Sequence, residues 1–502
     1  MRSSNLRPHS LLEVHVIIAG MEKGTSGAVG HRKDNSGSSG VTNLSLTEAS
    51  QFVRSKKISP VELTQACLNR IEQLNSNLNA FITVTTDSAL AQARKAEVEI
   101  QRGHWKGPLH GIPIALKDLI DTAGVCTTAA SELFKNRVPT EDAEVVRRLK
   151  ASGAVLLGKL NMHEFAYGAS SVISAFGPVR NPRNPEYMAG GSSSGSAAAV
   201  AAELCYAAVG SDTGGSIRQP AAYCGIVGLK PTYGRVSARG VVPLSLSIDH
   251  VGPMTRTVAD AALLLQVLAG YDAKDRTSMD APVPDYTAAL ADKVPSLRIG
   301  IPPTHYYDGL HPEIEAAMET ALRVLEKLTQ SRKQVELSED INPSANNATG
   351  VLLTKAEAYA YHRVHVARSP QLYQPETLRR ISTGAEVSAA AYSDALREMN
   401  QARRSVLRVF ETVDVLVTPT TAVPPFKISE LLADPEKLRS REQITLRNTR
   451  PLNLLGLPTI SIPCGRTSAG LPVGMQLTGT HRAETTVLRL AAAYERETNW
   501  SG

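Results

Sequence analysis

The sequence has few cysteines, few aromatic residues and no long apolar run. Its five cysteines, Cys67, Cys126, Cys205, Cys224 and Cys464, lie far apart without a C-x-x-C pair, so neither a disulfide framework nor a zinc ribbon is indicated. Phe, Tyr and Trp together make up only 5% of the residues. No apolar run reaches the roughly 18 residues that a membrane span needs, and we expect no membrane-spanning helix.

Charged residues of either sign form no dense block. The 54 basic and 48 acidic residues leave a net charge of +6 over 502 residues. Without a basic patch interleaved with aromatic side chains, we expect no nucleic-acid partner. The twelve histidines include no H-E-x-x-H pattern, and His362 and His365 have no nearby carboxylate in the sequence. We therefore expect no metal site and no other cofactor.

The N-terminal residues 1–42 are expected to form a disordered extension. Residues 22–42 are rich in Gly, Ser and charge, a composition that cannot bury enough apolar surface to become ordered. The apolar segment 11–20 is short and interrupted by polar residues, so we do not interpret it as a signal peptide. Met21 is an alternative first residue. We expect a cytoplasmic protein with one folded domain over residues 43–502.

Capping motifs and alternating apolar runs predict an α/β fold. Ser45-Leu-Thr-Glu48 and Ser59-Pro60-Val-Glu62 resemble capping boxes, and helices ending near Val53 and Gln73 should follow them. Later apolar runs alternate between strand and helix character, which favours a sheet with helices on both faces. The expected strands are 112–116, 154–157, 226–229, 413–417 and 459–462, and the expected helices are 142–151, 197–208 and 259–269.

Two Gly/Ser clusters flank one apolar helix and are the most unusual feature of the sequence. Residues 190–196 precede the helix expected over 197–208, and residues 210–216 follow it. A helix of a dozen residues is about 18 Å long, so the clusters meet only if the chain folds back, which the spacing does not require. Flexible loops are one alternative. Phosphate-binding loops are another, but neither cluster has a matching glycine pattern.

The second cluster is suited to stabilise an oxyanion. Glycines in Thr213-Gly214-Gly215-Ser216 let several backbone N–H groups point toward one spot. Ser216, at the end of this turn, could attack a carbonyl whose developing negative charge those groups would stabilise.

A serine nucleophile also needs a base. The nearest histidines, His163 and His250, lie in no G-x-S-x-G context. Lys117 ends the apolar strand 112–116, where burial would lower the lysine pKa and allow a neutral amine to accept a proton. The alternative is a strand-end lysine that forms an ion pair with Asp118 or Asp121.

Taken together, these segments resemble the amidase signature family over residues 44–498. The resemblance implies the amidase signature fold, a single large domain with a mixed central β-sheet covered by helices on both faces. The matching segments are Gly111–Asp118, Gly190–Ser193, Gly210–Pro220, Cys224–Thr232, Asp249–Pro253 and Leu457–Pro463.

The resemblance also implies a Ser–cis-Ser–Lys triad and its surroundings. In the family pattern, Ser216 would be the nucleophile, Ser192 a bridging serine after a cis peptide bond, and Lys117 the base. The backbone N–H groups of Thr213, Gly214, Gly215 and Ser216 would form the oxyanion hole, and Ser193, Asp212 and Arg218 would support the site. One departure is Ser194, where many members have glycine.

The implied function is hydrolysis of an amide C–N bond, with carbamates and anilides as further candidates, through an acyl-enzyme on Ser216. The expected partner is a small-molecule amide, carbamate or ester, and a homodimer is one candidate assembly.

The alternative function is that of the glutaminase-type A subunit of aspartyl/glutamyl-tRNA amidotransferase. His163 stands where that subunit usually has Asp, residues 355–410 resemble stand-alone amidases more, and no charged pair for glutamine can be assigned. A non-catalytic protein on the same fold is a third alternative.

Residues 300–450 and loops near 130–180 are expected to supply the substrate pocket. Aromatic side chains in these stretches would suit a hydrophobic acyl or aryl group, although each could equally belong to the core. The candidates are Phe134, Tyr167, Phe176, Tyr359 and Tyr392.

Overall fold

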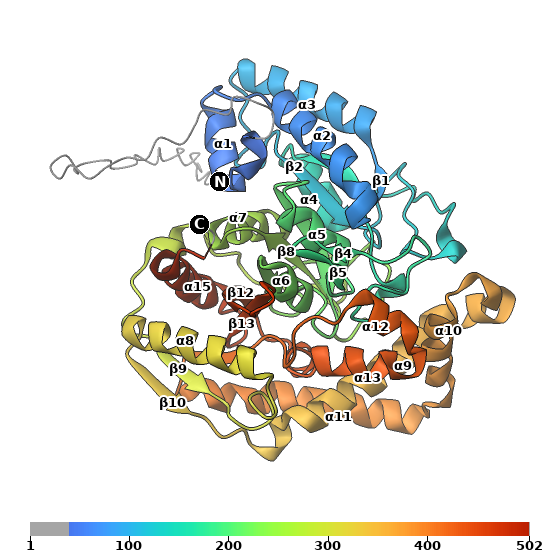
Figure 1. Ribbon diagram of the computed structural model, residues 1–502, viewed down its shortest axis with the longest axis vertical. Coiled ribbons are helices and arrows are strands. Elements are labelled where there is room, and N and C mark those ends of the chain that lie inside the picture. The colour runs from blue at the N-terminus through green and yellow to red at the C-terminus, as the bar shows by residue number, and fades with distance from the viewer. Residues whose placement is uncertain (1–39, 501–502) are drawn as a thin grey trace, which may run out of the picture. The chain divides into compact units, whose positions relative to one another are not determined.

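One large mixed sheet organises the chain. The computed structural model describes residues 40–500 (Figure 1). Eleven strands pair there in the order β1-β3-β2-β6-β8-β7-β12-β13-β11-β9-β10. The strands are β1 Phe81–Val84, β2 Pro113–Lys117, β3 Val155–Leu160, β6 Ala207–Asp212, β7 Val227–Lys230, β8 His250–Thr255, β9 Arg298–Ile301, β10 Ser331–Gln334, β11 Val415–Pro419, β12 Thr459–Arg466 and β13 Pro472–Gly479. Two short strands, β4 Arg180–Asn181 and β5 Asn184–Met188, form a separate antiparallel ribbon.

Strand direction changes along the sheet. Strands β3, β2 and β6 are parallel to one another, as are β11, β9 and β10. The strands between them, from β8 to β13, pair antiparallel. The predicted mixed sheet is therefore confirmed.

Helices connect the strands and cover the sheet. The helices are α1 Leu46–Arg54, α2 Pro60–Leu78, α3 Thr86–Gln101, α4 Glu144–Ala151, α5 Ser194–Ala201, α6 Arg218–Cys224, α7 Val258–Leu268, α8 Pro312–Leu328, α9 Pro343–Arg368, α10 Pro375–Ser382, α11 Ala389–Ser405, α12 Ile428–Ala433, α13 Pro435–Thr445, α14 Arg450–Leu454 and α15 Glu484–Thr498. The short 3₁₀ helix η1, Val41–Asn43, precedes them.

Both faces of the sheet are covered, as the glycines of β13 demonstrate. A Cβ built on Gly474 would meet Ala222 of α6, whereas one built on Gly479 would meet Val487 of α15. The two positions are an odd number of residues apart, and successive side chains of a strand point to opposite faces. Helices α6 and α15 therefore lie on opposite faces, and the predicted α/β fold is confirmed.

The helix starts follow the sequence closely. Ser45 forms the predicted capping box with Glu48, and the side chain of Ser59 accepts a hydrogen bond from Glu62 N–H with Pro60 at the first turn. Helix α2 extends to Leu78, beyond the predicted end, because its apolar stripe continues through Leu78.

The helix predicted over 197–208 is wrong in its second half. Helix α5 ends at Ala201, and Ala207 already begins strand β6. The Gly/Ser clusters are therefore separated by a short helix and a strand that leads back, which brings both to one end of β6. The apolar run conceals this change because α5, except for Ala201, and β6 are buried and neither alternates with polar residues.

The described residues belong to one compact unit, and its largest apolar cluster includes side chains from Leu46 near the start to Leu490 near the end. Within residues 40–500, no helix is both long and apolar enough to span a bilayer. The expectations for segment 11–20, for Met21 and for nearly all of the 1–42 extension lie outside the described residues. The boundary at residue 43 stays a prediction.

Candidate active site

Lys117 lies at the end of β2 with its side chain completely buried. Its Nζ donates to Ser192 Oγ over 2.7 Å and to Ser211 Oγ over 2.9 Å. The sequence predicted the proximity of Lys117 and Ser192, but it did not single out Ser211, which lies next to the predicted supporting residue Asp212.

The alternative of an ion pair between Lys117 and a neighbouring aspartate is wrong. The carboxylate of Asp118 is turned toward Thr128, which donates to it from both backbone N–H and hydroxyl, and lies 4.0 Å from Lys159 Nζ. Arg137 Nη1 and Nη2 donate to the two carboxylate oxygens of Asp121 at 2.7 and 2.6 Å. Both acids are therefore engaged elsewhere.

The surroundings of Lys117 favour its neutral form. Burial lowers the pKa of Lys117 to about 7, and the negative charges of Asp212 and Asp249 oppose that shift only in part. An amine with such a pKa is largely unprotonated at slightly alkaline pH and can accept a proton from a hydroxyl.

Ser192 lies immediately before helix α5, after a cis peptide bond from Gly191. The bond agrees with the geometry that the family resemblance implies for this position. Gly191 N–H donates to Gln219 Oε1 at 2.8 Å, and a Cβ at Gly191 would come within 2.7 Å of Ser171 Oγ. The site therefore has no room for a side chain at position 191.

Ser216 lies between β6 and α6, on the wall of a pocket that we call the Ser216 pocket. Its carbonyl oxygen accepts a hydrogen bond from Ser193 N–H at 3.3 Å, so the two Gly/Ser clusters lie side by side. Within residues 40–500 the hydroxyl of Ser216 forms no hydrogen bond, to Ser192 or to any other group. The hydroxyl is thus free to meet a ligand.

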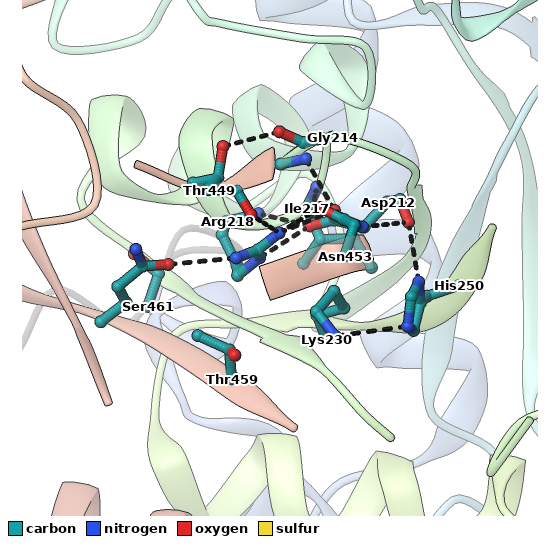
Figure 2. A network of polar contacts seen from close by, with 12 residues as sticks. Asp212, Gly214, Ile217, Arg218, Lys230, His250, Thr449, Asn453, Thr459 and Ser461 are labelled. Atoms are coloured by element: carbon teal, nitrogen blue, oxygen red, sulfur yellow. Dashed lines mark hydrogen bonds and ion pairs between the residues drawn. The ribbon is translucent and has the colours of Figure 1, made fainter. Parts of the chain in front are cut away.

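The carboxylate of Asp212 shapes the turn that leads to Ser216. It accepts hydrogen bonds from Gly215 N–H at 2.7 Å and Ile217 N–H at 3.1 Å, and it pairs with Arg218 Nε and Nη2 at 3.0 Å each. Burial alone would raise the pKa of Asp212, but Arg218, with contributions from Lys230 and Asn453, holds it well below its usual value. Figure 2 shows this network, in which Asn453 also donates to Asp212.

The predicted oxyanion hole needs one correction, at Gly215. Its N–H donates to Asp212 and is not free for a substrate oxygen. In the part of the chain that the structure describes, the N–H groups of Thr213, Gly214 and Ser216 have no partner. The four-residue motif could not distinguish Gly215 from its neighbours, because the acceptor of its N–H, the side chain of Asp212, lies outside the motif.

The residues predicted to support the site do contact it. Ser193 Oγ donates to Ser211 O at 3.1 Å and accepts from Ser211 N–H at 3.3 Å, which joins the first cluster to the end of β6. Arg218 also donates to Asn453 Oδ1 and Thr449 O. Asn453 and Thr449 were not predicted, since both lie more than two hundred residues from Asp212 in the sequence.

His163 and His250, the two histidines considered as bases for the serine nucleophile, do not have that role in the structure. Burial lowers the pKa of His163 to about 3, and its Nδ1 faces Ser171 N–H. His250 is buried against Lys230, with its Nδ1 next to Ile248 O. Neither ring contacts Ser216, in agreement with the sequence analysis.

Three stretches of chain line the Ser216 pocket. The first is 166–168 and the second is the turn with Thr213, Gly214 and Ser216. The third is the C-terminal part of the chain, which contributes residues from several elements: Val351 and Thr354 of α9, Arg439 of α13, Leu446, and Arg450 of α14. Leu244 completes the wall.

Of the aromatic side chains proposed for this pocket, only Tyr167 lines it. Phe134 packs edge-on against Phe165 in the core, Phe176 is partly exposed, Tyr359 packs against the main core cluster, and Tyr392 donates to Glu357.

Comparison with known proteins now places the chain in a family. A family model described as Amidase matches residues 62–488. The chain belongs to the amidase (amidase signature) family. The A subunit of glutamyl-tRNA(Gln) amidotransferase from Geobacter sp. (strain M21) is 43% identical over 484 residues, covering 92% of this chain and 98% of that relative.

Two solved structures are also similar. One is described as part of an unexpected vestigial protein complex that reveals the evolutionary origins of an s-triazine catabolic enzyme. It matches with a TM-score of 0.84 at 32% identity and covers 91% of this chain and 98% of that one. The native peptide amidase of Stenotrophomonas maltophilia matches with a TM-score of 0.76 at 34% identity, covering 91% and 97%. The fold and an amidohydrolase with a serine nucleophile are thereby supported at family level.

Proposed function

We propose that this chain hydrolyses an amide bond through an acyl-enzyme on Ser216. The observation that carries the proposal is the 2.7 Å hydrogen bond between Lys117 Nζ and Ser192 Oγ in a buried setting, with the free hydroxyl of Ser216 on the pocket wall. A base, a relay hydroxyl and a nucleophile are the groups that such chemistry needs.

In the proposed first step, neutral Lys117 takes the proton of Ser192 while Ser192 takes the proton of Ser216. Ser216 Oγ then forms a bond to the amide carbonyl carbon, and the carbonyl π electrons move to its oxygen. The N–H groups of Thr213, Gly214 and Ser216 stabilise that oxyanion. The arrangement of these free donors beside the nucleophile supports this assignment.

The relay then runs backward. Lys117 returns its proton through Ser192 to the leaving nitrogen as the C–N bond breaks, which leaves the acyl group on Ser216 and releases an amine or ammonia. Water, deprotonated by the same relay, attacks the ester and frees the acid. The cycle balances without an oxidant, a metal or another cofactor.

A panel of primary amides, anilides, carbamates and esters, run with wild type and Ser216→Ala, tests the proposal. We expect turnover of at least one amide by the wild type and a fall in kcat of about a thousandfold or more in Ser216→Ala. A fluorophosphonate should modify Ser216 in the wild type alone, as peptide mass spectrometry would reveal. Equal turnover by the two proteins would contradict the assignment, and a chain inert to both probes would match a non-catalytic protein.

The second candidate is the glutaminase-type A subunit of a tRNA-dependent amidotransferase. The name of the Geobacter relative favours it over a stand-alone amidase, because that protein matches over nearly its whole length. In this role the chain would release ammonia from glutamine for partner subunits. The charges of the Ser216 pocket favour the stand-alone amidase instead, since Arg439 and Arg450 line it and no carboxylate of the described chain does.

Partner dependence separates the two candidates. A subunit would copurify with other proteins of its source and would hydrolyse glutamine only with them and aminoacyl-tRNA. A stand-alone amidase would act alone on other amides. The cytoplasmic location and the homodimer stay predictions, which fractionation and light scattering of the purified chain would check.

A further inference from the structure

A second cavity, which we call the outer cavity, shares two lining residues with the Ser216 pocket. Val351 and Arg450 line both. Arg439 is the other cation that lines the Ser216 pocket, and Lys355 and Arg447 are the further cations that line the outer cavity. Among residues 40–500, no aspartate or glutamate lines either space. The charged side chains that line the two cavities are therefore all basic.

Arg450, which lines both cavities, lies beside the catalytic turn. A Cβ built on Gly214 would lie 3.3 Å from Arg450 Nε, so the guanidinium lies beside the turn that bears Ser216. Its Nη1 donates to a neutral group, Asn347 Oδ1, at 2.7 Å. Burial, with a further contribution from Arg439, lowers the pKa of Arg450 to about 9. No carboxylate in the described chain forms an ion pair with this cation.

A buried charge without a counter-ion is costly in the empty protein. The cost disappears when an anion binds, because a guanidinium and a carboxylate match in charge and in planar geometry. Arg447, which lines the outer cavity, has a buried Nη2 without a hydrogen-bond partner among the described residues.

Two acids near Arg439 and the catalytic turn are already engaged. Glu442 lies 4.0 Å from Arg439, but it pairs at 2.7 Å with Arg380 and accepts from Ser170. Asp249 accepts from Thr213 Oγ1 at 2.5 Å and from two backbone N–H groups. Both carboxylates are therefore already bound by groups of the protein.

We propose that the substrate is an amide that carries a carboxylate and no ammonium group, with the carboxylate bound by Arg450. This inference rests on the proposed amide hydrolysis and specifies its substrate class. Glutamine fits poorly, because its carboxylate would find a partner and its α-ammonium group would not.

Matched amides test the inference directly. Glutaramate is glutamine without the α-ammonium group, and pentanamide has the same carbon chain without the carboxylate. Malonamate and succinamate, each paired with the neutral amide of equal length, extend the series. We expect the best anionic amide to exceed its neutral partner and glutamine in kcat/KM by about tenfold or more. Equal values in every pair, or a preference for glutamine, would overturn the inference.

Substitution of Arg450 tests the assigned residue. In Arg450→Gln the preference for the anionic amide should fall by about tenfold. Arg441→Gln, on the same helix as Arg439 but outside both cavities, should keep the wild-type preference. An unchanged preference in Arg450→Gln would show that Arg450 does not bind the carboxylate. If this variant fails to fold, the comparison of matched amides with the wild-type protein still tests the inference.

Binding to Ser216→Ala separates this inference from the proposed function. Calorimetry should show tighter binding of the anionic amide than of its neutral partner, whether or not the wild type turns either over. Tighter anion binding without turnover would support the anion site and reject amide hydrolysis. Turnover of both amides without any anion preference would support amide hydrolysis and reject the anion site.

Discussion

Lys117 combines complete burial with two hydroxyl partners and no carboxylate partner among the described residues. Its pKa is lowered to about 7 because burial disfavours the ammonium form. Only the neutral amine can accept the proton of Ser192, so the active fraction grows as pH rises through that value. The value of kcat/KM for a neutral amide should therefore increase from about pH 5 and level off above about pH 8.

A pH profile of wild-type kcat/KM on one neutral amide checks this expectation. A neutral substrate is used so that its own titration does not contribute. Ser211→Ala serves as a matched variant, because Ser211 Oγ accepts from Lys117 Nζ at 2.9 Å. Loss of that acceptor disfavours the charged amine further, and the midpoint should move to lower pH. A profile that falls steadily over the same range would contradict the assigned base.

At the scale of single residues, the sequence predicted what lies within short motifs and missed what lies across the fold. Lys117, Ser192 and Ser216 each belong to a recognisable segment. Asn453 is 241 residues from Asp212, and Arg450 has no motif of its own. Their roles arise only when α14 packs beside the catalytic turn.

At the scale of elements, α14 holds the turn between β6 and α6. Asn453 Nδ2 donates to the carbonyl and the carboxylate of Asp212 at 2.9 and 2.8 Å, and Asn453 Oδ1 accepts from Arg218 at 2.7 Å. In addition, Thr449 Oγ1 donates to Gly214 O at 2.6 Å (Figure 2). The C-terminal part of the chain thus fixes the geometry of a turn formed by its middle.

Asn453→Ala should therefore weaken both stability and catalysis. The substitution leaves buried groups of Asp212 and Arg218 without partners, which should lower the free energy of unfolding by about 1–3 kcal/mol. Denaturant titration measures this loss, and kcat should fall because the turn is no longer held. Asn400→Ala, at an exposed position of α11, should change the unfolding free energy by less than about 0.5 kcal/mol. Equal effects of the two substitutions would show that α14 does not hold the turn.

The elements themselves were predicted with uneven success, for physical reasons. Capped helices such as α1 and α7 start where the side chains of Ser45 and Thr257 specify. The transition from α5 to β6 was missed, because a fully buried helix and a fully buried strand present the same continuous apolar run. Strand β8 was missed as well, although it pairs with β6 along its whole length.

At the scale of the whole molecule, both ends of the described chain meet at α7. The carboxylate of Asp260 accepts from Leu46 N–H at 3.1 Å and Thr47 N–H at 2.9 Å at the start of α1. Glu495 of α15 accepts from Val258 N–H at the start of α7, at 3.2 Å to either oxygen. Helix α7 therefore ties the first and last helices to the sheet.

This junction should make stability depend on pH in a specific way. Burial, with a contribution from the negative charge of Asp260, raises the pKa of Glu495 from 4.5 to about 7. Because the folded pKa is the higher one, the contribution of Glu495 is complete below pH 4.5 and is lost as pH rises to about 7. Glu495→Gln keeps an acceptor for Val258 N–H but cannot ionise.

The unfolding free energy of Glu495→Gln, relative to wild type, should therefore increase between pH 4.5 and about 7 and stay constant above. Denaturant midpoints measured at several pH values for both proteins give this difference, in which the titrating groups that do not interact with Glu495 cancel. Glu497→Gln, an exposed position on the same helix, should show a difference that does not change with pH. A pH-independent difference for Glu495→Gln would mean that Glu495 is as well solvated in the folded chain as in the unfolded one, and that α15 does not bury a carboxyl against α7.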